Sequence, residues 1–485
     1  MRRIVTVIFC TLLAFSAAAI GFQASAIVHQ QKSDDAVIGN WLGEIQVPPG
    51  GLRIVFHISR GPDGGLITKL DSPDQNANGL PTTSTSFGNG TLRVDIANLK
   101  ARFEGKIDKT GNIIEGTFTQ GADMPLKIKR LNKDAVVKKV SHPQEPKPPF
   151  PYLSRETSYV NPAGNIKLAG TLTYPKGKGP FAAVVMITGS GPQNRDEELV
   201  GHKPFLVIAD YFTRHGIAVL RVDDRGVGGS SGSTPNSTTN DFVGDVLAGV
   251  QYLKKQKEID QKHIGVVGHS EGGVIGPMAA VRSKDVAFVV MMAGTGLNGR
   301  EIIDLQSRKI ALAMGVPAAT LDKNAPATKK IFNIATTVKD PVEAKKQAVA
   351  YLEGLYDKLT EAQQKAVGPK PAWLNNQVGS IFNPWMLYFL MLDPRVTLRQ
   401  MKTPVLAMIG SKDLQVPAPE NIPEIKKALK QAGNKDATVV TLPGLNHLFQ
   451  HCTKGTPNEY QNISETIAPE ALDMMTKWIL KHTGK

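Results

Sequence analysis

Short apolar runs separated by turn residues fill the first part of the chain. Leu92, Val94 and Ile96 alternate with Arg93 and Asp95, which is the period of a strand with one face in water. Similar runs, divided by glycine-rich turns, occur at residues 52–58, 66–70, 113–118 and 126–131. This pattern predicts an all-β domain over residues 27–142, folded as a small barrel or sandwich of about seven strands.

A proline-rich segment follows this domain. It contains Pro143, Pro146, Pro148, Pro149 and Pro151. Proline lacks a backbone N–H and has a fixed φ, so such a density of proline excludes a helix or an inner strand. We therefore predict a stiff linker and a domain boundary at residues 143–152.

Beyond the linker, apolar strands alternate with amphipathic helices. Continuous apolar runs predict buried strands at residues 182–188, 217–222, 264–268, 286–292, 405–410 and 438–442. Helical spacing of apolar residues predicts helices at residues 204–215, 241–257 and 468–480. The alternation predicts an α/β domain, a mostly parallel sheet with helices on both faces, built from residues 153–296 and 401–485.

Residues 297–400 interrupt the alternation and have helical periodicity. They predict a helical cap inserted between two strands of the sheet, over the carboxyl ends of the strands. Trp385, Tyr388 and Phe389 lie within this insertion. Their side chains would line a substrate pocket or form the core of the cap, and the sequence leaves both interpretations open.

The first 26 residues have the pattern of an export signal. Arg2 and Arg3 precede an apolar run at residues 4–20, and a small-residue cleavage site follows at residues 24–26. The apolar run only just approaches the length of a bilayer span, so a retained anchor is the alternative. We expect a signal peptide at residues 1–26 and a periplasmic or secreted mature protein.

Charge and cysteine content narrow the class of site. The chain has 485 residues and a formal net charge of +14. The basic excess is spread along the sequence without a recognisable binding module, so we expect no nucleic-acid partner. Cys10 lies in the predicted signal, which leaves Cys452 alone in the mature chain. One cysteine excludes both an intramolecular disulfide and a Cys-rich zinc site.

The G-H-S-E-G sequence at residues 268–272 carries the strongest chemical signal. It follows the predicted strand at residues 264–268 and precedes small residues that favour a helix. G-x-S-x-G in this context is typical of a nucleophile elbow, a sharp turn that lifts a serine above an α/β sheet. Glycines flank the serine because such a turn leaves no room for a Cβ. Ser270 is therefore the predicted nucleophile.

Asp413 and His447, further along the chain, complete a predicted triad with Ser270. A serine hydroxyl needs a base that is itself oriented by an acid, and in this class of fold the order along the chain is Ser, Asp or Glu, then His. Asp413 follows the predicted strand at residues 405–410, and His447 follows the strand at residues 438–442. Both residues are therefore expected at the same edge of the sheet as Ser270.

Each member of this pair has an alternative. Asp413 taken alone could be a surface carboxylate, and Asp436 could replace it, although Asp436 precedes a strand and so belongs to the opposite edge. His451 and His215 compete with His447 for the role of base. Only His447 directly follows a strand of the predicted sheet.

Acyl transfer also needs donors for the developing oxyanion. The expected donors are the backbone N–H of Glu271, after the nucleophile, and that of Ser190, in the glycine-rich loop at residues 188–192. The alternative for that loop is an ordinary strand-to-helix turn.

The R-V-D-D-R-G segment at residues 221–226 lacks a phosphate-loop frame, so we interpret it as a loop held by an Arg–Asp pair. We interpret His269 as a packed elbow residue.

Taken together, these segments resemble the α/β-hydrolase carboxylesterases of the dienelactone hydrolase and prolyl-oligopeptidase-like branch. The segments that carry the resemblance are residues 189–196, 221–226, 268–273, 410–413 and 442–447. By this resemblance Ser270 is the nucleophile, Asp413 the orienting acid and His447 the general base. It also implies an enzyme that needs no metal or organic cofactor.

The resemblance leads to an expected function. We expect an exported serine hydrolase that cleaves short-chain carboxylic esters, with an acyl-peptide hydrolase or an acyl-thioesterase as the alternative. The N-terminal domain is similar to the leader domain of some secreted bacterial esterases and is too short for the propeller of the oligopeptidases. It would bind cell-envelope glycan or lipid, or only pack at the rim of the site.

Overall fold

The computed structural model describes residues 35–47, 50–73, 77–120, 122–132 and 141–484. The predicted signal peptide at residues 1–26 lies outside the described residues. The chain divides into two compact units, Met1–Lys139 and Val140–Lys485. The proline-rich segment belongs to the second unit, where Gln144 accepts a hydrogen bond from Thr466 N–H (2.6 Å) and donates one to Ile467 O (2.6 Å).

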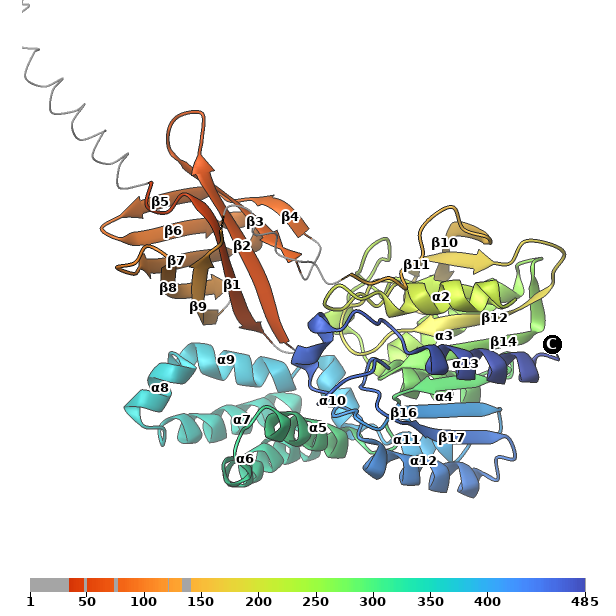
Figure 1. The fold of residues 1–485 in the computed structure, drawn as a ribbon. Coiled ribbons are helices and arrows are strands. Elements are labelled where there is room, and N and C mark those ends of the chain that lie inside the picture. Colours follow the sequence, from red (N-terminus) through yellow and green to blue (C-terminus); the bar gives the residue numbers. More distant parts are fainter. Residues whose placement is uncertain (1–34, 48–49, 74–76, 121, 133–140, 485) are drawn as a thin grey trace, which may run out of the picture. The chain divides into compact units, whose positions relative to one another are not determined.

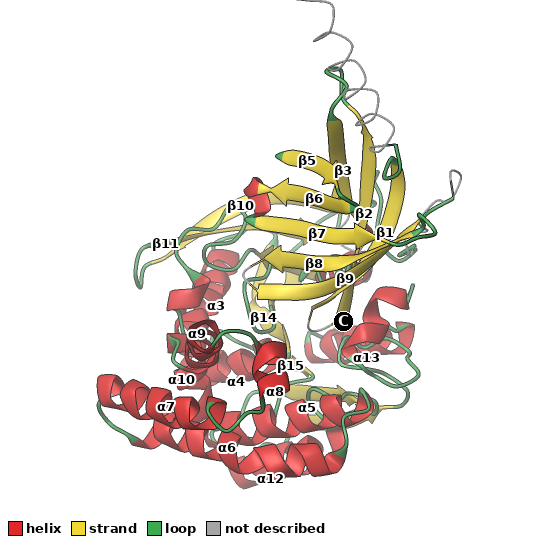
Figure 2. Cartoon of the chain, turned by 90° about the vertical axis from the view of Figure 1, so that its left-hand side faces the viewer, coloured by secondary structure: helices red, strands yellow, loops and turns green. Residues whose placement is uncertain are grey.

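The first unit is a single antiparallel sheet of nine strands in the order β4-β3-β2-β1-β9-β8-β7-β6-β5. The strands are β1 (Gly39–Val47), β2 (Gly50–Arg60), β3 (Leu66–Ser72), β4 (Ala77–Pro81), β5 (Ser84–Gly88), β6 (Thr91–Ile96), β7 (Ala101–Ile107), β8 (Ile113–Gln120) and β9 (Ala122–Arg130). The sheet is strongly curved (Figure 2). Thr85 in β5 donates to the hydroxyl of Thr68 in β3 (2.8 Å), so its two ends meet.

The concave side of this sheet holds the core of the unit. Burial in β6 alternates residue by residue, as the polar and apolar pattern predicts. Trp41, Phe56 and Phe103 are fully buried at the centre. The predicted all-β domain is therefore confirmed, although it has more strands than expected. The segments A-N-G-L-P of β4 and S-T-S-F-G of β5 carry too few apolar residues for a periodic signal.

The second unit is built on an eight-stranded sheet in the order β10-β11-β13-β12-β14-β15-β16-β17. The strands are β10 (Leu153–Asn161), β11 (Ile166–Tyr174), β12 (Phe181–Ile187), β13 (Ala218–Val222), β14 (Ile259–His269), β15 (Val289–Met292), β16 (Val405–Gly410) and β17 (Ala437–Leu442). Pairing is parallel from β13 through β17 and antiparallel for β10 and β11. The mostly parallel sheet is as predicted. The two antiparallel strands β10 and β11 were not predicted from the sequence.

Helices bury both faces of this sheet (Figure 1). On one side pack α2 (Pro204–Arg214) and α13 (Pro469–His482), and on the other α3 (Thr239–Lys254), α4 (Gly272–Arg282) and α12 (Ala418–Ala432). Strand β12 shows how the layers divide. Ala183 and Val185 belong to one hydrophobic core, and Val184 and Met186 to the other, because successive side chains of a strand point to opposite faces.

The described elements between β15 and β16 are all helices. They are α5 (Gly299–Ala313), α6 (Ala318–Thr337), α7 (Pro341–Tyr356), α8 (Glu361–Val367), α9 (Lys370–Ile381), α10 (Pro384–Met391) and α11 (Pro394–Leu398). In Figure 1, α6 to α9 form a group beside the sheet of this unit. They have a small core of their own that includes Ile331, Ala348, Leu352 and Val378. We refer to α5–α11 as the cap.

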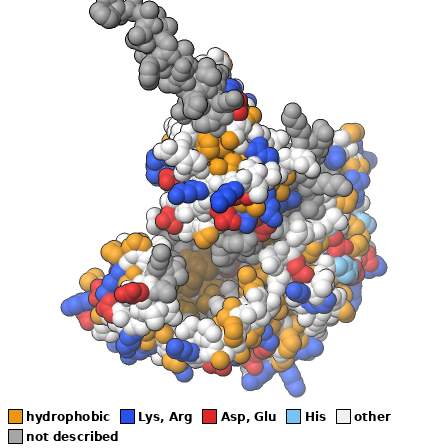
Figure 3. Space-filling view, turned by 60° about the vertical axis from the view of Figure 1, so that its left-hand side comes forward, with side chains coloured by type: hydrophobic (Ala, Val, Ile, Leu, Met, Phe, Trp, Pro, Cys, Tyr) orange, Lys and Arg blue, Asp and Glu red, His pale blue; other side chains and the backbone are white. Residues whose placement is uncertain are grey.

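Surface composition adds little to this picture. On the face shown in Figure 3, Lys and Arg side chains are scattered among acidic, hydrophobic and neutral polar ones. Among the described residues, no helix combines the length and apolar character that crossing a membrane requires.

Candidate active site

Ser270 occupies the turn between β14 and α4. Its φ is +54°, a left-handed conformation that residues other than glycine rarely adopt. Two backbone hydrogen bonds hold it: Ser270 N–H donates to Met292 O (2.8 Å), and Gly273 N–H donates to Ser270 O (3.0 Å). The nucleophile candidate therefore sits on a strained turn fixed by the neighbouring strand β15.

The glycines on either side of Ser270 allow three backbones to come together. A Cβ on Gly268 would overlap the carbonyl of Gly272, and a Cβ on Gly272 would overlap the carbonyl of Ile187 at the end of β12. Neither clash can be relieved by rotating a side chain, because the atoms that would be struck belong to the backbone. The glycine requirement expected from the sequence thus has a direct steric cause.

Asp413 and His447 meet at the same edge of the sheet. The side chain of Asp413 is fully buried in the loop after β16, and its Oδ2 accepts a hydrogen bond from His447 Nδ1 (2.8 Å). Its Oδ1 accepts from the N–H groups of Gln415 and Val416 (2.8 Å each). Because Nδ1 donates to the carboxylate, Nε2 of the neutral imidazole is left as the basic nitrogen.

The loop that carries His447 is fixed by its own side chains. Asn446 is fully buried, and its Oδ1 accepts from the N–H groups of Leu448 and Gln450 (3.0 Å each). Gly410 at the end of β16 lies so close to this loop that a Cβ there would overlap the carbonyl of Leu445. The candidate base and the candidate acid are therefore held by adjacent strand ends.

His447 also lies beside the elbow. Its ring centroid is 4.8 Å from that of His269, the residue before Ser270. Within the described residues, the Ser270 hydroxyl makes no hydrogen bond to His447 or to any other group. Such a contact is often long without substrate and tightens in the substrate complex. The structure thus brings the candidate acid and base into contact and places the base beside the elbow.

The rival residues lie elsewhere. Asp436 pairs with His482 (3.0 Å). His451 pairs with Glu465 and Glu470, and more than half of its side chain is exposed. His215 bonds the carbonyl of Tyr211 within its own helix turn. None of the three rivals contacts the elbow.

The glycine-rich loop after β12 lies against the nucleophile. A Cβ placed on Gly189 would be 3.3 Å from Ser270 Cβ. Within the described part of the chain, the backbone N–H groups of Ser190 and Glu271 donate to no other protein group. Two unpaired donors beside a serine are the arrangement that an oxyanion hole requires.

A family model and a curated relative match parts of this chain. The profile of the serine aminopeptidase S33 family (Hydrolase_4) matches residues 203–367, which include Ser270 but end before Asp413. Esterase EstD of Thermotoga maritima is 26% identical over 318 residues, covering 65% of this chain and 66% of the esterase, just under two thirds of its length. The chain has the α/β-hydrolase fold. The predicted resemblance to the esterases of this fold is confirmed.

Solved structures similar to this chain include enzymes. An esterase from Pyrococcus furiosus is 17% identical, covers 71% of this chain and 98% of its own, and has a TM-score of 0.43. The α/β hydrolase GrgF from a Penicillium species is 16% identical, covers 69% of this chain and 100% of its own, and has a TM-score of 0.42.

The side chain of Glu271 joins the elbow to the cap, a link the sequence analysis missed. Its buried carboxylate accepts hydrogen bonds from Thr239 Oγ1 (2.7 Å) and Trp385 Nε1 (2.8 and 3.0 Å). Burial raises the pKa of Glu271, although donors from Thr239, Trp385 and Ser190 oppose that shift. No sequence pattern revealed this contact, because Trp385 lies 114 residues away.

The three predicted pocket residues have different surroundings. Trp385 is half-buried and bonded to Glu271, next to the nucleophile. Phe389 stacks on Trp385 with centroids 5.2 Å apart and is part of the hydrophobic core. Tyr388 is half-buried, and within the described residues it makes no hydrogen bond or ring contact. Only Trp385 is brought to the elbow by a direct contact.

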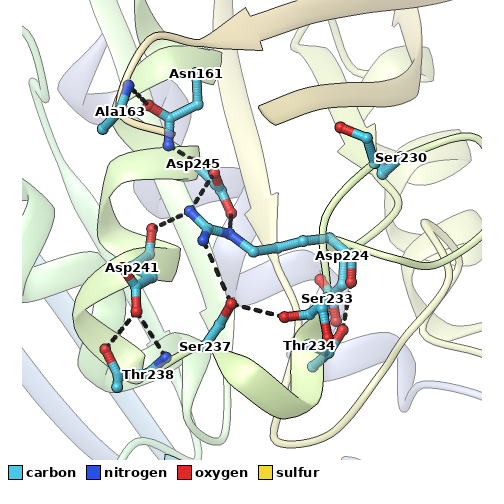
Figure 4. A network of polar contacts seen from close by, with 12 residues as sticks. Asn161, Ala163, Asp224, Ser230, Ser233, Thr234, Ser237, Thr238, Asp241 and Asp245 are labelled. Carbon is cyan, nitrogen blue, oxygen red and sulfur yellow. Dashed lines mark hydrogen bonds and ion pairs between the residues drawn. The ribbon is translucent and has the colours of Figure 1, made fainter. Parts of the chain in front are cut away.

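The loop after β13 is held by ion pairs. Figure 4 shows the contacts made to Asp245. Arg225 donates to both oxygens of Asp245 (2.5 and 3.0 Å) and to the backbone carbonyl of Asp241 (3.0 Å). Arg195 binds Asp223 in the same two-pronged way (3.1 and 2.7 Å). These pairs fix the loop after β13.

Asp223 and Asp224 are neighbours with opposite pKa shifts. Burial alone would raise the pKa of Asp223, but hydrogen bonds from Arg195 outweigh it and lower the pKa. Burial raises the pKa of Asp224 to about 7, and the carboxylates of Glu197 and Glu271 add to the shift. Donors from Thr188 and Gln193 only partly oppose it. Asp223 is therefore paired with a cation, whereas Asp224 is buried close to other carboxylates.

The described residues contain no group of three or more His, Cys, Asp or Glu side chains placed to hold a metal ion.

The steric argument predicts the effect of Gly272→Ala. The added Cβ would push α4 away from β12 and displace Ser270, so labelling of Ser270 by a fluorophosphonate should slow by about 100-fold or more. Gly354→Ala in α7 is the control, because a Cβ there meets nothing within 4 Å, and its labelling rate should equal that of the wild type. Equal rates for both variants would contradict the argument.

The two adjacent aspartates predict opposite pH responses. Between about pH 4 and 7 the folded state keeps a proton on Asp224 that the unfolded state releases. The contribution of Asp224 to the free energy of unfolding therefore falls as pH rises. Asp224→Asn should therefore gain about 2–4 kcal/mol relative to the wild type from pH 4 to pH 8. Asp223→Asn should be about 3 kcal/mol less stable than the wild type at pH 7, with a gap that narrows only below about pH 4. Chemical denaturation at several pH values measures both; parallel curves would contradict the assignment.

Proposed function

We propose that the chain is an exported serine esterase that cleaves short-chain carboxylic esters through an acyl-enzyme on Ser270. The observation that carries the proposal is the buried Asp413–His447 hydrogen bond of 2.8 Å at the sheet edge where the elbow presents Ser270. An acid that orients a histidine beside an elbow serine is the arrangement that activates a hydroxyl nucleophile.

The proposed reaction follows from the positions of these groups. Ser270 Oγ attacks the ester carbonyl while His447 Nε2 accepts its proton, and Asp413 stabilises the resulting imidazolium. The N–H groups of Ser190 and Glu271 bind the oxyanion, each contributing roughly 3 kcal/mol. His447 then protonates the leaving alcohol. Water, deprotonated by His447, releases the carboxylic acid and restores Ser270.

The preference for short acyl groups rests on the cap. Glu271 holds the indole of Trp385 next to the nucleophile, where a large ring limits the space for an acyl chain. The curated relative is named an esterase, which supports ester cleavage. The matched family is described as a serine aminopeptidase, which keeps an acyl-peptide hydrolase, along with an acyl-thioesterase, as the alternative.

Hydrolysis of p-nitrophenyl acetate tests the proposal. Ser270→Ala should abolish turnover, and Asp413→Asn should lower kcat by about 10⁴-fold because the histidine would take the wrong tautomer. Asp436→Asn, which alters the exposed partner of His482, is the control and should keep wild-type kcat. Full activity of Ser270→Ala would overturn the mechanism. A higher kcat/KM for an acyl-aminoacyl anilide or an acyl-CoA would instead favour the alternative.

We also propose that the mature protein is exported and that its N-terminal domain contacts cell-envelope glycan or lipid. Large side chains such as Trp41 and Phe56 fill the interior of that domain, so a ligand would bind on its outer surface. Fractionation of cells that express the full chain should place it outside the cytoplasm with residue 27 at the N-terminus, and peptidoglycan or envelope lipid should retain it. Cytoplasmic protein with an intact leader would contradict export, and no retention would favour a purely structural domain.

A further inference from the structure

A buried Glu197–His269 pair connects three separate parts of the site. Glu197 Oε1 accepts hydrogen bonds from Gly189 N–H (2.6 Å), in the loop after β12, and from His269 Nδ1 (3.0 Å), on the elbow. His269 Nε2 lies 2.9 Å from the backbone carbonyl of His447. The oxyanion loop, the nucleophile turn and the loop of the base are therefore joined through two side chains.

The contacts determine how the pair is protonated. The carbonyl of His447 only accepts hydrogen bonds, so His269 Nε2 must carry a proton. Glu197 Oε1 already accepts a hydrogen bond from a backbone N–H, so it is also the acceptor for Nδ1 of the ring. Burial lowers the pKa of His269, but the Glu197 carboxylate outweighs burial and raises the pKa above its ordinary value. The Glu197 side chain therefore favours the protonated ring of His269.

Both residues are in environments that are unfavourable for a polar side chain, and the backbone of Glu197 is strained. Glu197 is 5% exposed and has a left-handed φ of +52°. His269 is 6% exposed. A buried ion pair adds little net stability compared with apolar residues of similar size, and a left-handed conformation costs about 1 kcal/mol or more. General stability of the core therefore gives no reason for this pair.

We propose that Glu197 and His269 are positioning residues that set the distance between Ser270 and His447. The inference rests on the proposed roles of Ser270 and His447. Asp413 fixes the orientation of the His447 ring, whereas His269 fixes the backbone from which that ring projects. Because His269 is the residue before Ser270, its hydrogen bond ties the base directly to the nucleophile turn. Glu197 extends the same tie to the oxyanion loop through Gly189.

Two substitutions of His269 separate its hydrogen bonds. The amide nitrogen of glutamine falls near the position of Nε2, so His269→Gln can still donate to the His447 carbonyl. The amide of asparagine falls near Nδ1, so His269→Asn keeps the contact with Glu197 but loses that with His447. The readouts are kcat and KM for p-nitrophenyl acetate and the rate of Ser270 labelling by a fluorophosphonate, with Tm as the check on folding.

The expected result is a difference between the matched variants. A misplaced base costs about 10–100-fold in kcat and in labelling rate for His269→Asn, with KM nearly unchanged. His269→Gln should fall only about threefold, because the bond that holds the base survives. Wild-type rates in both variants, or equal losses in both at equal Tm, would overturn the inference.

Further outcomes separate the inference from the proposed function. Labelling of the wild type without ester cleavage would reject the esterase activity and leave the comparison of labelling rates valid. Absence of wild-type labelling would reject both. If His269→Asn does not fold, Glu197→Gln and Glu197→Leu test the other half of the tie, the bonds of Glu197 to Gly189 and His269. Glutamine keeps an acceptor for Gly189 N–H and His269 and should retain most of the labelling rate, whereas leucine should lose it; equal rates would overturn the inference.

Discussion

The close approach of three backbones beneath Ser270 is the constraint on which the rest of the site depends. Strand β14, helix α4 and the end of β12 meet where Gly268 and Gly272 have no space for a Cβ. This contact forces Ser270 into its left-handed conformation and brings the glycine-rich loop after β12 against it. Once these backbones are fixed, the ends of β16 and β17 bring Asp413 and His447 to the same edge, because parallel strands share the direction of their carboxyl ends.

Backbone N–H groups donate hydrogen bonds to the buried carboxylates around this site. Asp413 accepts two of them, from Gln415 and Val416, and Glu197 accepts one from Gly189. Each carboxylate also binds one histidine ring. A buried charge is costly unless it is hydrogen-bonded and paired. Asp224 has donors but no cation, and burial raises its pKa.

The fold and the triad candidates could be predicted from the sequence where one local pattern carried the information. Strand β16 is buried on both faces and reads as a continuous apolar run, so its bounds were predicted at residues 405–410. Strand β10 has mostly polar or half-exposed residues. No alternation of apolar and polar residues therefore predicted this strand or its pairing with β11. Glu197 and the Trp385–Glu271 contact could not be predicted, because their partners are far apart in sequence and meet only after the sheet has formed.

Helices α6, α7 and α9 of the cap share a hydrophobic core separate from the two that bury the sheet. Side chains in α6, α7 and α9 can therefore change size or polarity without disturbing the packing that supports Ser270. Such changes would reach the reaction through α10, whose Trp385 is hydrogen-bonded to the residue after the nucleophile. Under the proposed function, the choice of substrate and the chemistry performed on it would be encoded in different stretches of the chain. Exchanging cap segments would then alter the substrate range and leave Ser270, Asp413 and His447 in place.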